Sequence, residues 1–140
     1  MNSVSVPGSA ARETVHTSRA RQCEKIEEIC KTLVACGLVA LDEQAQALGL
    51  SRSTTWTLLR EIHKSSGLSA STVNKILSAP RLPPRVRVKV LEYVCEKVAG
   101  KYGDRSHRLR AYVRRLGPDH LQAGSLEVSA AARVVNLAAA

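Results

Sequence analysis

The chain has 140 residues and a formal net charge of +9, with no Phe, one Trp and three Tyr. This length suits one domain with a core made mostly of Leu and Val. No apolar run is long enough to span a bilayer and the first residues lack the apolar stretch of a secretory signal, so we expect a cytoplasmic protein without membrane contact.

Composition divides the chain into three expected segments. Residues 1–17 mix Ser, Thr, Gly and Pro with isolated apolar residues, which predicts a flexible arm. Residues 18–116 carry apolar positions at helical spacing, which predicts an all-α, compact multi-helix domain. Residues 117–140 begin with Gly-Pro and end in an alanine-rich stretch, which predicts a tail that is disordered or marginally helical.

Apolar residues at steps of three and four predict a first helix over residues 19–36. A short second helix is expected over residues 42–48, ended by Gly49. A third helix follows at once, with Ser51 as its N-cap and its last turn near Arg60. The spacing leaves a turn of three residues between the second and third helices.

A fourth helix is expected over residues 70–78. Ser69 is in the N-cap position, and Leu68 and Val73 are spaced to pack as a hydrophobic staple. The stretch 79–84 contains three prolines and is expected to be irregular.

Residues 84–99 carry two conflicting patterns. Residues 85–90 alternate basic residues with Val, which is typical of a half-buried strand. Val86, Val90, Val94 and Val98 nevertheless recur every fourth residue, and prolines are well tolerated at a helix start. We therefore expect a fifth helix here.

The basic residues concentrate in one third of the chain, since residues 81–116 hold 11 Lys and Arg against 3 Asp and Glu. A sixth helix is expected over residues 105–116, with Asp104 as its cap. This charge suits nucleic acid, and a solvated surface is the alternative. Three residues of the sixth helix are candidate phosphate contacts: Arg110, Arg114 and Arg115.

Neither a metal site nor an enzyme is indicated. The cysteines have no C-x-x-C spacing and no nearby His pair, so we expect small buried apolar residues at Cys23, Cys30, Cys36 and Cys95. The acidic residues are scattered, the histidines are isolated in sequence, and no glycine-rich phosphate loop is present. No cofactor is expected.

Residues 41–60 have the pattern of a helix-turn-helix, whose second helix lies exposed in the DNA major groove. Ala45 is small where the two helices must cross, and Gly49 suits a left-handed turn. Leu48, Leu50 and Leu58 can fill the corner. Two residues depart from the usual pattern, since apolar side chains are common at the positions of Gln44 and Thr55.

A second copy of this pattern follows, because residues 49–59 and 67–77 are identical at six of eleven positions. The first copy with its preceding helix resembles the Cro and phage-repressor class. The second, as a unit of about residues 59–94, resembles lac-repressor-type regulators. Both resemblances are at the level of motifs and cover roughly residues 40–95.

The first resemblance implies that residues 51–60 read the groove. Arg52 could make a bidentate contact to guanine, and Ser53 and Thr57 could bond base edges or phosphate. Trp56 is expected to fill a hydrophobic corner, with stacking on a sugar or contact with a thymine methyl as the alternative. Arg60 also projects from this helix.

The second resemblance implies a different reader. Ala70, Ser71, Asn74 and Lys75 would then face the groove, and Asn74 could read adenine. His63 would stand at the crossing of the two helices, where its bulk departs from the family pattern.

These patterns predict a protein that binds double-stranded DNA sequence-specifically, as a small prokaryotic or phage-type transcriptional regulator. An RNA-binding or protein-interaction module, or the DNA-binding part of a recombinase or transposase system, is the alternative. The first or sixth helix could support a homodimer. No small-molecule effector domain is expected, because only a few dozen residues follow the basic helices.

Overall fold

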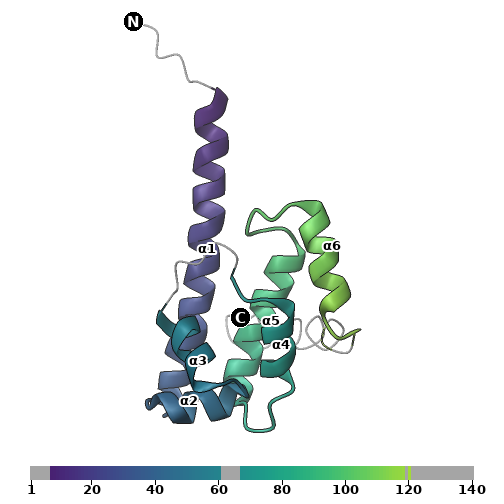
Figure 1. Cartoon of the computed structure of the whole chain (residues 1–140). Coiled ribbons are helices and arrows are strands. Elements are labelled where there is room, and N and C mark those ends of the chain that lie inside the picture. The colour runs from purple at the N-terminus through teal and green to yellow at the C-terminus, as the bar shows by residue number, and fades with distance from the viewer. Residues whose placement is uncertain (1–6, 61–66, 119, 121–140) are drawn as a thin grey trace, which may run out of the picture.

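The computed structural model describes residues 7–60, 67–118 and 120, with side chains from residue 17 onward (Figure 1). These residues form six α-helices and no strand, so the predicted all-α class is confirmed. The helices are α1 (Pro7–Ala35), α2 (Leu41–Leu48), α3 (Arg52–Arg60), α4 (Ala70–Leu77), α5 (Pro84–Val98) and α6 (Ser106–Arg115).

The helix start at Pro7 differs from the sequence prediction. Residues 7–17 were expected to be an arm without regular structure, and they instead continue α1. Adding turns to an existing helix needs no new nucleus, the two alanines at 10 and 11 are strong helix formers, and proline fits the first helical turn. Residues 1–6, and residues 121–140 of the predicted tail, lie outside the described residues.

The core forms where α5 packs along α1. Residues 85–90 are helical, so the strand pattern in this stretch does not describe the fold. Val86 and Val90 are completely buried among the aliphatic side chains of α1 and α4, while Arg87 and Lys89 are partly exposed. The four-residue spacing therefore outweighs the two-residue spacing, because it places the valines on one helix face.

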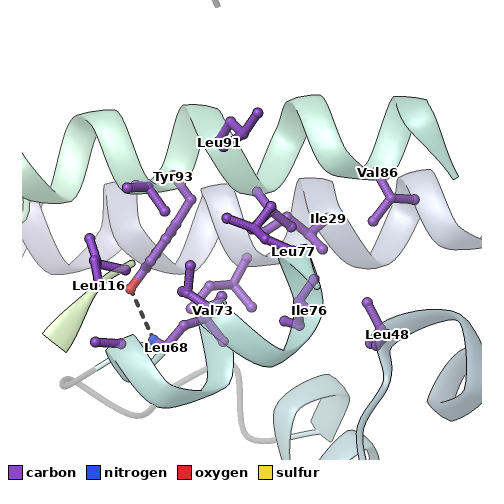
Figure 2. Packing of buried hydrophobic residues seen from close by; sticks show 14 of the residues in the cluster. Ile29, Leu48, Leu68, Val73, Ile76, Leu77, Val86, Leu91, Tyr93 and Leu116 are labelled. Carbon is purple, nitrogen blue, oxygen red and sulfur yellow. Dashed lines mark hydrogen bonds between the residues drawn. The ribbon is translucent and has the colours of Figure 1, made fainter. Parts of the chain in front are cut away.

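A buried tyrosine ties three helices together. This residue is Tyr93 of α5. Its hydroxyl accepts a hydrogen bond from the amide of Leu68 at 2.9 Å and donates one to Gln22 Oε1 of α1 at 2.9 Å. Figure 2 shows Tyr93 reaching across the core to Leu68 just before α4. The predicted staple residues Leu68 and Val73 are both buried. The start of α4 is therefore built into the core.

The cap predicted for the sixth helix is wrong. Arg105 occupies the N-cap position of α6 and makes no side-chain cap hydrogen bond. Asp104 instead places Oδ2 3.1 Å from Nζ of Lys97, whose side chain is almost fully buried. A buried ammonium needs an opposite charge more than a helix end needs a cap, which explains the exchange of roles.

Candidate nucleic-acid interface

Helices α2 and α3 are joined by the expected three-residue turn. Gly49 has a φ of 65°, in the left-handed region that glycine adopts without strain. The amide of Leu50 donates to the carbonyl of Ala45 at 3.1 Å and closes the end of α2. Ala45 and Leu48 are buried beneath the turn. The predicted helix, turn and helix are thus present in this order.

The two polar departures from the expected pattern are both buried and hydrogen-bonded. Gln44 donates from Nε2 to the carbonyl of Leu38 at 2.8 Å, which fastens the loop before α2. Thr55 is completely buried, and its hydroxyl donates to the carbonyl of Ser51 at 2.8 Å. A buried polar group with a partner carries little penalty, so both residues are compatible with this geometry.

Helix α3 presents most of its surface to solvent. Thr55 is its one buried residue, and Thr57 is half-buried. The four other residues expected to contact DNA are exposed: Arg52, Ser53, Trp56 and Arg60. The outer face of α3 is therefore open to solvent.

Trp56 does not fill the core, and the expectation of core packing was wrong. The side chain is 49% exposed and borders a shallow depression with Leu41, Arg52, Ser53 and Thr57. Leu48 is completely buried in the core, and Leu50 and Leu58 pack against that core, so it is filled at this turn without the indole. The indole is therefore left on the outer face.

Arg52 is paired across this face with Asp42 of α2. Its Nε lies 3.5 Å from Asp42 Oδ1, and both side chains are 70% exposed. An exposed pair of this kind contributes little to stability. The guanidinium can therefore exchange this partner for another anion at small cost.

The second candidate reader, α4, is held differently. Its residues Ala70, Val73, Ile76 and Leu77 are buried, and it packs against α2, α5 and α6. Ser71 and Lys75 remain exposed. In this second unit α3 would be the supporting helix, and the crossing position would be His63, which lies outside the described residues.

Asn74 is fully engaged within the fold. Its Nδ2 donates to the carbonyl of Arg115 at 2.8 Å, and its Oδ1 accepts from the amide of Gly117 at 3.1 Å. These bonds satisfy backbone groups at the end of α6. An adenine contact would require both to break, which disfavours Asn74 as a base reader.

The acidic residues of the basic segment are all used inside the fold. Glu92 lies 3.3 Å from Lys25, Glu96 lies 2.7 Å from Arg21, and Asp104 pairs with Lys97. Burial raises the pKa of Glu96, but hydrogen bonds from Arg21 and Tyr102 outweigh it and hold that pKa below its ordinary value. The excess positive charge is left on and around α6.

The exposed basic residues of this region are Lys101, Arg105, Arg108, Arg110, Arg114 and Arg115. The three predicted phosphate contacts are thus exposed, as such contacts must be. In Figure 1, however, α6 and α3 lie on opposite sides of α4 and α5. The fold does not gather the predicted base readers and the basic residues of α6 into one cluster.

The four cysteines are all partly buried: Cys23, Cys30, Cys36 and Cys95. Burial raises the pKa of the Cys30 thiol to about 11, so it is protonated at neutral pH. Within the described residues no three His, Cys, Asp or Glu side chains gather as metal ligands. Among those same residues, no helix combines the length and apolar character that a membrane crossing requires.

Comparison with protein-family models, curated proteins and solved structures finds no match to this chain.

Proposed function

We propose that this chain is a sequence-specific binding protein of double-stranded DNA, a small cytoplasmic transcriptional regulator that reads the major groove with α3. The exposure of α3 carries the proposal, because a helix directly after a tight turn buries one residue and leaves its polar face open. A major groove admits an α-helix, and base edges are read by side chains on such a face.

The exposed residues of α3 have the chemistry for this role. Arg52 can offer two parallel N–H donors to guanine O6 and N7 after leaving Asp42. The hydroxyls of Ser53 and Thr57 can bond base edges or phosphates. Trp56 offers an apolar edge to a thymine methyl or a sugar. Arg60 is the last residue of α3, and a contact from Arg60 to a phosphate would fix the orientation of the helix.

The arginines of α6 would act differently from those of α3. Since α6 lies across α4 and α5 from α3, its charges would supply long-range attraction or contact backbone at another part of a bent site. Two copies of the chain on two half-sites would double both contributions, and such half-sites are spaced by about one turn of DNA.

Selection of bound sites from random duplex DNA is the first step of the test, followed by variants on the preferred site. Arg52→Ala should cost about 1 to 3 kcal/mol and relax discrimination at one base pair. Lys75→Ala is the matched control, because Lys75 is an exposed cation on α4. It should leave the base preference unchanged.

Salt dependence separates base reading from charge attraction. Neutralising Arg110, Arg114 and Arg115 should weaken binding to all sequences alike and lower the salt slope by about one for each phosphate that the variant no longer neutralises. The proposal fails if well-folded Arg52→Ala protein keeps the full sequence preference, or if structured RNA competes better than duplex DNA. An RNA-binding role through basic α6 would then be the better account.

A further inference from the structure

A second feature lies away from α3. A cavity of about 610 Å³ opens between α1, the start of α4, the end of α5, and the stretch 102–115 that leads into and forms α6. Its described lining includes five cations: Arg19, Lys97, Arg105, Arg108 and Arg115. The walls come from separate parts of the sequence, so only the folded chain assembles them.

The charge of this cavity is strongly positive. Asp104 is the one carboxylate in its described lining, and the ammonium of Lys97 lies 3.1 Å from that carboxylate. Among the described residues, no carboxylate pairs with the four arginines of the lining, which are exposed. Four guanidiniums around one hollow repel each other unless an anion lies between them.

The inner wall holds a polar group that lacks a partner. The hydroxyl of Tyr112 is buried without a hydrogen bond among the described residues, on a side chain only 9% exposed. Burial raises the pKa of Tyr112, so the hydroxyl stays protonated and can donate at neutral pH. Oδ2 of Asp104 is also buried without a hydrogen bond among the described residues, and Asp104 adds to the raised pKa of Tyr112. Buried polar groups are nearly always hydrogen-bonded to protein, water or a ligand, so Tyr112 offers a donor to a group bound beside it.

Ser69 adds a further feature to the same wall. It is the N-cap of α4, and a helix N-terminus carries a partial positive charge that attracts phosphate. The volume is within the range of pockets that enclose small molecules, and it is too small for a duplex. The observations therefore agree on a compact anion.

We propose that this cavity is a binding site for a phosphate-bearing small molecule, with its phosphate held by Arg105, Arg108 and Arg115 and reached by the hydroxyl of Tyr112. Arginine suits this ligand because its planar fork matches phosphate oxygens. The site is independent of the DNA-reading role of α3, because none of the five residues expected to read DNA lines it.

Titration calorimetry of the full chain tests the site with ATP, AMP, inorganic phosphate and unphosphorylated adenosine. We expect ATP or AMP to bind and adenosine to fail. Replacing both Arg105→Gln and Arg108→Gln should weaken the binding by roughly tenfold or more, since hydrogen bonds to charged groups are the strong ones. Arg85→Gln is the matched control, because Arg85 is an exposed arginine of α5 outside the cavity lining.

Tyr112→Phe separates a ligand role from a structural one. No described residue hydrogen-bonds to this hydroxyl, so the melting temperature should hold or rise while the affinity for the phosphate compound falls. A lower melting temperature with unchanged affinity would overturn the assignment.

Parallel binding measurements with duplex DNA decide whether these arginines bind a small phosphate compound or the DNA backbone. If none of the phosphate compounds binds, or if the double arginine variant weakens only duplex binding, the small-molecule site is refuted. The second result would assign these arginines to the DNA backbone. Neither result bears on Arg52, so the two proposals fail separately.

Discussion

Residues 49–59 and 67–77 share six of eleven residues and the same local structure, but they differ in what surrounds them. Gly49 and Gly67 both have a φ of 65°. In the first segment Ser51 Oγ accepts the amide of Thr54 at 3.2 Å, and in the second Ser69 Oγ accepts the amide of Thr72 at 3.1 Å. The shared residues thus specify the same turn and cap twice.

Exposure separates the two segments. Helix α3 buries Thr55 alone, whereas α4 buries four residues. Arg52 of α3 corresponds to the buried Ala70 of α4, but Leu59 and Leu77 are the same residue and only Leu77 is fully buried. One local structure can therefore serve as an open surface or as part of the core, depending on the helices that pack against it.

The largest expected effect tests how deeply each turn is built into the fold. A Cβ on Gly67 would collide with the buried oxygens of Gln22 and Tyr93, in addition to the strain of a positive φ. Gly67→Ala should therefore lower the free energy of unfolding by about 2 to 5 kcal/mol. Denaturant unfolding measures it.

Gly49→Ala is the matched control for the same backbone angle. Its Cβ would meet Ala79 Cβ at 3.0 Å, a tight contact near the surface. We expect a loss of only about 1 to 2 kcal/mol. Equal losses at Gly49 and Gly67 would show that the second turn has no special place in the core, contrary to the comparison.

The next effect concerns Asn74, which the sequence offered as an adenine reader. Asn74→Ala should lower the free energy of unfolding by about 1 to 2 kcal/mol, because two backbone groups at the end of α6 lose their partner. Hydrogen exchange of the Gly117 amide should become faster. Ser71→Ala, an exposed change on the same helix, should alter neither. A selective loss of one base preference in stable Asn74→Ala protein would restore α4 as a reader.

The limits of sequence reasoning follow from the same comparison. Five helices were predicted close to their observed bounds, because caps, left-handed glycines and four-residue valine spacing are local signals. The early start of α1 and the pairing of Asp104 were missed. The early start of α1 depends on added turns that extend a helix already stabilised by packing. The pairing of Asp104 depends on Lys97, a buried residue of a different helix, α5.

The candidate site was predicted unevenly for a similar reason. The exposure of Arg52 and Ser53 follows from the turn before them, so the residue pattern was sufficient to predict that these two side chains are exposed. The solvent position of Trp56 depends on which side chains already fill the corner, and the bonds of Asn74 join it to residues about forty positions away. The cavity beside α6 could not be found from spacing, since α1, the start of α4 and residues 97–115 all line it.

A third comparison exchanges the completely buried residues at equivalent positions, Thr55 and Val73. Val73→Thr should cost about 1 to 2 kcal/mol, because it adds a hydroxyl to an aliphatic core. Thr55→Val should change the free energy of unfolding by less than about 0.5 kcal/mol, since the carbonyl of Ser51 keeps the bond from the Thr55 amide. Thermal and denaturant unfolding would both register the asymmetry. The opposite order of costs would mean that α3, and not α4, is packed as the core helix.

A small effect on stability is also expected at the outer face of α3. Asp42→Asn removes the partner of Arg52, but the pair is long and exposed, so the free energy of unfolding should fall by less than about 1 kcal/mol. Duplex affinity should instead rise by about 2- to 5-fold at low salt, because a carboxylate that repels phosphate and competes for the guanidinium is gone. Glu43→Gln controls for the lost charge at the start of α2, since Glu43 is also exposed in that first turn and no described cation pairs with it. It should give the smaller gain. An equal gain from both variants would reduce the effect to general charge repulsion, and no gain from either would place the DNA away from this face, which would leave α3 without a ligand.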